Sequence, residues 1–173
     1  MYMKHILPIL TITTLAAAAS AQSAAASSGL SYNRVGVAYS DNLSGYGLTA
    51  SALVGSSNFL VSGSTTIGGG TAGNGNDHIS LGYVFKNAAL GADAIVSVGS
   101  NETYGIAVRK DLGSNIELGF GYERTVGINL WGVELAYNLT KQYQIALGYY
   151  KVSGSGTING KSSDTQIALR YNF

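Results

Sequence analysis

The chain ends with the segment TQIALRYNF, residues 165–173, in which apolar and polar side chains alternate. One parity carries the apolar residues Ile167, Leu169, Tyr171 and Phe173. The other parity carries Gln166, the small residue Ala168, Arg170 and Asn172. Because successive side chains of a strand point to opposite faces, this segment predicts a strand with one apolar and one polar face.

The same period-two pattern can be followed upstream, and it predicts nine further strands. Their lengths are close to the ~9–11 residues that a tilted transmembrane strand needs. An even number of antiparallel strands, with short turns on one side and longer loops on the other, is typical of transmembrane barrels. We therefore expect an all-β, up-and-down antiparallel transmembrane β-barrel of ten strands, with eight as the alternative. The expected strands span residues 30–40, 44–54, 57–66, 77–86, 91–100, 103–111, 114–124, 127–139, 142–152 and 163–173.

The face that shares parity with Phe173 carries the large apolar residues, so we expect it to contact lipid. Its charges, Lys110, Arg124 and Lys151, fall at strand ends, as required where a mid-bilayer Lys or Arg costs about 2–4 kcal/mol. The alternative is a soluble barrel with the faces reversed. Such a barrel would have to pack the large apolar side chains into a lumen that holds little more than one small ligand.

The N-terminal residues predict an export signal. Lys4 and His5 form a short positive region, residues 6–15 are apolar, and residues 19–21 (Ala-Ser-Ala) match the small-x-small cleavage pattern. The apolar stretch is too short for a membrane-spanning helix, which needs about 20 residues. We expect a cleavable signal peptide over residues 1–21, a short flexible segment over 22–29 and the barrel over 30–173.

Composition excludes several classes of function. The chain has no cysteine, which argues against disulfides and thiolate metal sites. Charged residues make up 11% of the chain, against roughly 25% in soluble domains. Removal of Lys4 with the signal leaves 9 basic residues (10 minus 1) against 9 acidic ones. Without a basic excess, we expect no nucleic-acid partner.

The terminal strand resembles the signal by which Gram-negative outer-membrane β-barrels are recognised for insertion. The resemblance covers the export signal, the strand pattern and the aromatic C-terminus of small porin-like barrels, and it identifies no narrower family. It implies residence in the outer membrane, contact with its lipids, and handling by periplasmic chaperones and the barrel-assembly machinery. We expect a monomer. The residues that match the assembly signal are Ile167, Leu169, Tyr171 and Phe173.

The opposite parity faces the lumen and carries charges of balanced sign. The basic residues are Arg34, Lys86, Arg109 and Arg170, and the acidic ones are Asp93, Glu117, Glu123 and Glu134. Folding the hairpins about their turns predicts Lys86 near Asp93, Asp93 opposite Arg109, and Arg109 opposite Glu117. This row can be a salt-bridged plug or the constriction of a narrow pore, and the sequence leaves both interpretations open.

Glycines fill much of the remaining lumen face and leave space for a water path. Tyr150, Leu130, Leu60 and Leu53 point inward and could close it. The function we expect first is a narrow passive channel for ions or small solutes. The alternative is a closed structural or surface-interaction barrel with a salt-bridged lumen.

A membrane-embedded hydrolase is a remote third alternative. His78 is the one histidine left after signal removal, and it shares a face with Ser80, but no acidic partner is evident and Asp77 points to the other face. One histidine also cannot supply a metal site with the usual number of ligands. We therefore expect no enzyme activity, no catalytic or metal site and no cofactor.

Overall fold

The computed structural model describes residues 29–41, 45–67, 77–154 and 162–173. The predicted signal peptide, residues 1–21, and residues 22–28 of the predicted flexible segment lie outside the described residues. Within the described part, no helix is long and apolar enough to cross a membrane.

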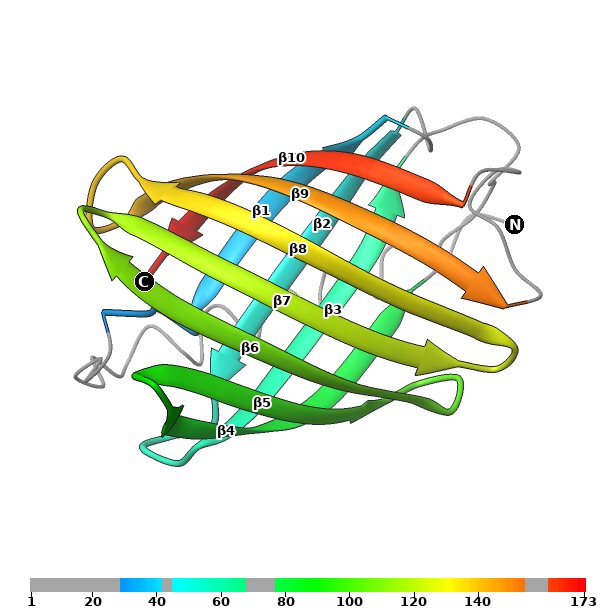
Figure 1. Cartoon of the computed structure of the whole chain (residues 1–173), viewed down its shortest axis with the longest axis horizontal. Coiled ribbons are helices and arrows are strands. Elements are labelled where there is room, and N and C mark those ends of the chain that lie inside the picture. Colours follow the sequence, from blue (N-terminus) through cyan, green and yellow to red (C-terminus); the bar gives the residue numbers. More distant parts are fainter. Residues whose placement is uncertain (1–28, 42–44, 68–76, 155–161) are drawn as a thin grey trace, which may run out of the picture.

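The described chain forms one closed antiparallel barrel (Figure 1). Each strand pairs with its neighbours in sequence, and β1 pairs with β10 to close the sheet. The ten-stranded up-and-down barrel predicted from the alternation is therefore confirmed. The strands are β1 (Arg34–Ser40), β2 (Gly45–Leu53), β3 (Phe59–Ile67), β4 (His78–Ala89), β5 (Ala92–Gly99), β6 (Thr103–Gly113), β7 (Ile116–Thr125), β8 (Ile128–Asn138), β9 (Tyr143–Gly154) and β10 (Ser163–Asn172).

We call the end of the barrel at which β4 joins β5 and β6 joins β7 the turn end, and the opposite end the loop end. The loop end also has two tight connections, β5–β6 and β7–β8. Leu90 and Gly91 connect β4 to β5 with φ of 53° and 72°, and Ser114 and Asn115 connect β6 to β7 with φ of 53° and 66°. Two consecutive positive φ angles characterise the type I′ turn, whose twist matches that of the flanking strands. These turns lie where the sequence predicted short connections.

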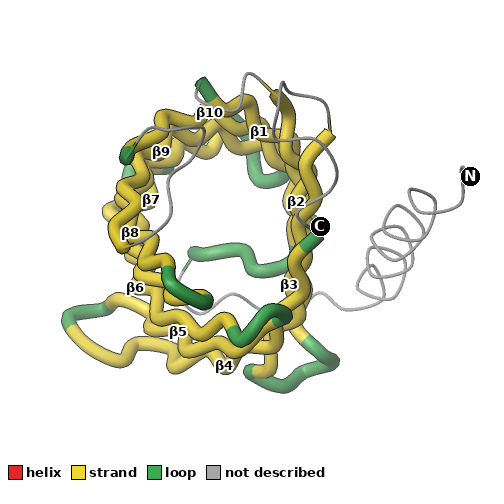
Figure 2. The backbone as a smooth tube through the Cα atoms, turned by 90° about the vertical axis from the view of Figure 1, so that its right-hand side faces the viewer, coloured by secondary structure: helices red, strands yellow, loops and turns green. Residues whose placement is uncertain are grey.

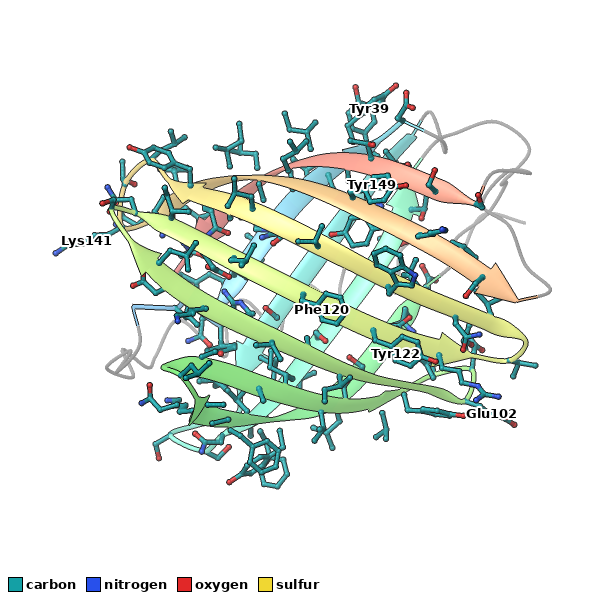
Figure 3. All side chains as sticks on the ribbon, viewed as in Figure 1. Tyr39, Glu102, Phe120, Tyr122, Lys141 and Tyr149 are labelled. Atoms are coloured by element: carbon teal, nitrogen blue, oxygen red, sulfur yellow. The ribbon has the colours of Figure 1, made fainter. Side chains whose placement is uncertain are left out.

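The outer face of the barrel is apolar over the middle of the strands. Phe120 (Figure 3) is half exposed there, and so are Leu147 and Leu169. Aromatic pairs lie at both ends: Phe59–Tyr83 (5.2 Å between ring centroids) and Tyr143–Tyr171 (5.4 Å) at the turn end, and Tyr39–Tyr46 (5.6 Å) at the loop end. Rings at the two rims of an apolar band are typical of membrane-spanning barrels.

The first strand is shorter than the sequence predicted, because residues 29–33 leave the wall and enter the lumen. We call these residues the N-terminal strap. Figure 2 shows the strap crossing the opening of the barrel. Leu30 and Tyr32 are only 3% and 5% exposed. Leu30 and Tyr32 lie on the parity that faces the lumen in β1, whereas the apolar residues of β1 (Val35, Val37 and Tyr39) lie on the other parity. The apolar phase therefore changes at Asn33 and Arg34, and the predicted strand was extended across that change.

A small apolar core fills part of the lumen beneath the strap. It joins Leu30 and Tyr32 to inward-facing residues of β3, β4 and β5, with Leu53 and Ala107 packed against it. Its wall residues are Leu60, Val84 and Ile95. The predicted inward orientation of Leu60 and Leu53 is thus confirmed, and they contribute to an apolar plug on one side of the barrel.

Candidate functional site in the barrel lumen

One wall of the lumen, formed by β2 to β5, is lined with hydroxyl groups. Ser62 and Ser80 face each other across β3 and β4, with their Oγ atoms 2.7 Å apart. The wall borders a cavity of about 310 Å³ towards the loop end, which we call the loop-side cavity. The hydroxyl residues that line it are Thr49, Ser51, Ser62, Ser64, Ser80 and Ser97.

A second cavity, of about 510 Å³, opens at the turn end. We call it the turn-side cavity. The strap forms one side of it. The turn-end residues of β2, β4, β6, β7, β8 and β10, the β6–β7 and β8–β9 turns and Phe173 contribute the rest. Its polar lining includes Lys86, Asp111, Asn138, Lys141 and Asn172.

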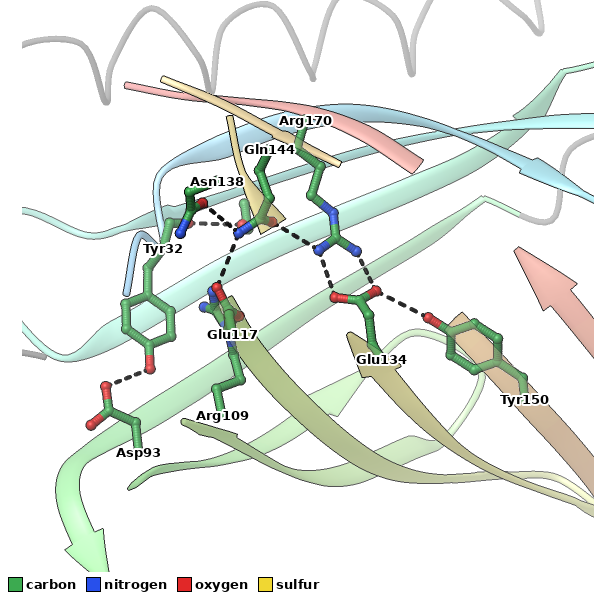
Figure 4. Close-up of polar contacts among 10 residues, drawn as sticks. Tyr32, Asp93, Arg109, Glu117, Glu134, Asn138, Gln144, Tyr150 and Arg170 are labelled. Carbon is green, nitrogen blue, oxygen red and sulfur yellow. Dashed lines mark hydrogen bonds and ion pairs between the residues drawn. The ribbon is translucent and has the colours of Figure 1, made fainter. Parts of the chain in front are cut away.

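Between the two cavities, charged and amide side chains form a continuous network across β6 to β10 (Figure 4). At one end, Arg109 donates from Nε to Oε1 of Glu117 at 2.6 Å. Gln144 Nε2 donates to Oε2 of Glu117 at 3.1 Å, and its Oε1 accepts from Arg170 Nη1, also at 3.1 Å. Gln144 therefore connects two ion pairs by using both ends of its amide.

The second ion pair of this network is bidentate. Arg170 donates from Nη1 to Oε1 of Glu134 at 2.6 Å and from Nη2 to Oε2 of the same carboxylate. Tyr150 donates its hydroxyl to Glu134 Oε2 at 3.3 Å. We call the set Arg109, Glu117, Gln144, Arg170, Glu134 and Tyr150 the charge network. Paired donors and acceptors of this kind orient both partners and resist displacement.

The ion pairs of the charge network are buried, so each charge depends on its partner. Arg109 is 6% exposed and Glu117 is 4% exposed. A charge removed from water is tolerated when its partners satisfy it, and removal of one partner leaves the other uncompensated. The network therefore holds five strands at one level and sets the polar cross-section of the lumen.

Two buried guanidinium donors in the described part of the lumen lack a hydrogen-bond partner. Among the described residues, Arg34 Nη1 and Arg109 Nη2 have no hydrogen-bond partner although both atoms are buried. Arg34 also lines the loop-side cavity. A buried donor without a partner carries a desolvation cost, which a new hydrogen bond would remove.

The strap is attached to the lumen through Tyr32 and Asn33. The hydroxyl of Tyr32 donates to Asp93 Oδ2 at 2.7 Å, and its ring lies under the guanidinium of Arg109, whose Cζ is 4.6 Å from the ring centroid. Ser51 Oγ donates to the carbonyl of Tyr32 at 2.8 Å. Asn33 accepts from the backbone N of Leu53 through Oδ1, at 2.9 Å.

The predicted charge row is partly reproduced. Asp93 and Arg109 are register partners on β5 and β6, as predicted. Arg109 also contacts Glu117, but the predicted direct opposition is wrong: Gly119 lies opposite Arg109 and Asp111 opposite Glu117, so the contact is diagonal. Asp93 accepts hydrogen bonds from the Tyr32 hydroxyl and from the backbone N of Asn87. Lys86 lines the turn-side cavity, and its contact with Asp93 stays a prediction. The β4–β5 pairing shifts register directly beyond Phe85.

The pairing of Glu134 with Arg170 was not foreseen from the sequence, because the two residues lie on β8 and β10 with β9 between them. Gly148 of β9 lies opposite Glu134 on one side and Gln166 on the other. Tyr150 occupies the space over two glycines: a Cβ at Gly132 or Gly148 would lie 2.4 or 2.5 Å from its ring. The feature of the sequence that could have indicated the contact between Glu134 and Arg170 is the group of lumen-facing glycines around Glu134.

The remaining predicted lumen residues lie nearer the loop end. Glu123 and His78 both line the loop-side cavity. His78 Nδ1 is 3.3 Å from Ser100 Oγ, whereas Asp77 accepts from Thr65 Oγ1 at 2.6 Å. Asp77 thus has another partner and does not orient the histidine, in agreement with the opposite faces predicted for the two.

Comparison with solved structures finds outer-membrane porins. The porin NanC has 11% identity and a TM-score of 0.51, over 81% of this chain and 98% of NanC. The porin KdgM has 13% identity and a TM-score of 0.49, over 81% and 99% of the two chains. The outer-membrane protein Omp33 of Acinetobacter baumannii has 12% identity and a TM-score of 0.34, over 84% and 100%.

Comparison by sequence finds no match, neither to a protein-family model nor to a curated protein. The likeness to NanC concerns the fold, and it spans nearly the whole of both barrels. The chain therefore has the architecture of a small outer-membrane porin barrel, which is what its terminal strand predicted.

Proposed function

We propose that the protein is a narrow passive channel for ions or small solutes in the outer membrane of a Gram-negative bacterium. The observation that carries the proposal is the lumen: polar cavities of about 310 and 510 Å³ lie on either side of one buried charge network. An apolar outer face and a polar inner face require lipid outside and water inside. The porin fold supports the same location.

The charge network is the constriction of this channel. Its ion pairs hold the guanidinium and carboxylate groups in fixed positions, and the hydroxyl wall of β2 to β5 faces them. A solute that reaches this level exchanges part of its hydration shell for the serine hydroxyls of this wall. Because Arg109 and Arg170 are matched by Glu117 and Glu134, selectivity between cations and anions is weak.

Assembly follows from the terminal strand. β10 presents its apolar parity to lipid and closes the barrel against β1. Handling by periplasmic chaperones and the barrel-assembly machinery, with the turn end towards the periplasm, fits this arrangement. The protein acts as a monomer in contact with outer-membrane lipids.

A closed structural barrel is the second candidate, and the strap favours it. Leu30 and Tyr32 fill lumen space next to the charge network. In this alternative the network and the strap together are a permanent plug, and the external connections carry a surface role.

A liposome-swelling assay separates the two functions. Liposomes that contain the purified, folded protein should swell in isotonic solutions of small sugars, and swelling should slow as the solute grows. Liposomes with an equal mass of heat-unfolded protein are the control. Swelling no faster than in this control, for even the smallest solute, would contradict the channel and favour the permanent plug.

A further inference from the structure

The strap is held in the lumen mainly by side chains. Among the described residues its one backbone–backbone hydrogen bond runs from Phe173 N to the carbonyl of Asn33, at 3.0 Å. From Asn33 towards Gly29, the strap is anchored by the apolar contacts of Leu30, by the ring and hydroxyl of Tyr32, and by Ser51 Oγ, which donates to the Tyr32 carbonyl at 2.8 Å. Because the strap is not paired with a strand of the sheet, it can move within the lumen without disrupting the strand pairing.

The Tyr32 side chain lies between two charged residues, Asp93 and Arg109. Asp93 and Arg109 face each other across β5 and β6 as direct register partners. In the structure, Asp93 accepts from the Tyr32 hydroxyl while Arg109 covers the Tyr32 ring and leaves its own Nη2 without a hydrogen-bond partner among the described residues. The tyrosine therefore interacts with both members of a pair that the strand register brings together.

We propose that the strap is a built-in gate of the channel, with Tyr32 as its latch. This inference rests on the proposed channel function and concerns its regulation. In the closed state, Tyr32 bonds to Asp93 and Leu30 packs against Leu60, Val84 and Ile95. In the open state, the strap swings about Asn33 into the turn-side cavity, and Arg109 binds Asp93 directly.

The exchange of partners is what makes two states possible. When Tyr32 leaves, Asp93 loses one donor and gains the guanidinium of Arg109, so no buried charge is left unsatisfied. The ion pair of Arg109 with Glu117 uses Nε, which leaves Nη2 for Asp93. The turn-side cavity of about 510 Å³ borders the strap and provides room for the movement.

The closed state is favoured, because opening exposes the apolar side chains beneath Leu30. A variant that weakens the latch shifts the population towards the open state by the free energy it removes. Removal of a hydrogen bond to a charged group corresponds to about tenfold in such an equilibrium.

Single-channel recording of three variants in planar bilayers tests the gate. Each protein is first shown to be folded by its heat-modifiable mobility on gels. Tyr32→Ala should give long open times and a mean current about tenfold or more above that of the unmodified protein. Tyr32→Phe keeps the ring and loses the bond to Asp93, so it should open more often with the same current per opening.

Tyr122→Phe is the matched control. Tyr122 lies on the outer face and donates to Asn129 Oδ1 at 2.8 Å, so its variant loses one tyrosine hydrogen bond outside the lumen and should gate like the unmodified protein. If Tyr32→Ala does not fold, Tyr32→Phe decides: an unchanged open fraction overturns the gate. Identical currents in all folded proteins overturn the gate and leave the channel standing, whereas silence in all of them overturns both.

Discussion

At the scale of single residues, the lumen is organised by pairs that share one buried environment. Arg109 and Glu117 are each more than nine-tenths buried and joined by one short contact. In such a pair the stability contributed by each residue depends on the other, because either charge alone is uncompensated.

A double-mutant cycle measures this dependence. Glu117→Leu alone should destabilise the barrel by about 3–5 kcal/mol, because it leaves the Arg109 guanidinium buried without its carboxylate. Arg109→Leu should have a similar effect, and the double variant should be less destabilised than the sum of the two. Equilibrium urea unfolding in lipid vesicles supplies the free energies.

The matched pair for this cycle lies on the outer surface: Tyr122→Phe and Asn129→Ala remove an exposed hydrogen bond and should show little coupling. Strictly additive effects of the Arg109 and Glu117 substitutions would contradict the assigned contact. Such a result would also mean that the Arg109–Glu117 pair does not hold that end of the charge network.

Single residues also mark the limit of prediction from sequence. Strand register placed Asp93 beside Arg109, because adjacent strands are related by their turns. It did not place Glu134 beside Arg170, since that contact crosses β9 and depends on barrel curvature and on the missing side chain of Gly148. Contacts between neighbouring strands are encoded locally, whereas contacts across the lumen are not.

At the scale of elements, the strands were the most predictable part of the chain. Lipid on one side and water on the other impose the alternation on almost every position, so nine of the ten strands begin and end near their predicted limits. The first strand differs because the predicted strand included Leu30 and Tyr32, which the structure buries in the lumen. The change of apolar parity between Tyr32 and Val35 was the signal in the sequence that the segment leaves the wall.

The terminal element carries its own prediction. Phe173 stacks on Tyr171 with ring centroids 6.4 Å apart, and its backbone N donates to Asn33. Phe173→Ala should remove most of the protein from the outer-membrane fraction, because it removes the aromatic end of the assembly signal. The measurement is the amount of folded, heat-modifiable barrel in isolated outer membranes.

Val126→Ala serves as the control for that experiment. Val126 is 69% exposed between β7 and β8 at the loop end, so this variant loses apolar surface far from the signal and should assemble normally. Equal amounts of folded barrel from the Phe173→Ala and Val126→Ala proteins would show that the terminal aromatic is not required for assembly.

At the scale of the whole molecule, closure of the sheet allows the barrel to span a membrane. The pairing of β1 with β10 leaves no free edge, which is what a β-structure needs within hydrocarbon. The polar side chains face the lumen. Whether the lumen conducts depends on the charge network and the strap together.

The most direct test is the current carried across a planar bilayer by the purified protein, with folding confirmed by heat-modifiable mobility. We predict brief current steps of one defined size, with a reversal potential in a salt gradient close to that of an unselective pore, because the charges of the constriction are balanced. Complete silence from demonstrably folded protein, in the Tyr32→Ala variant as well, would contradict the channel and identify the lumen as a permanent plug.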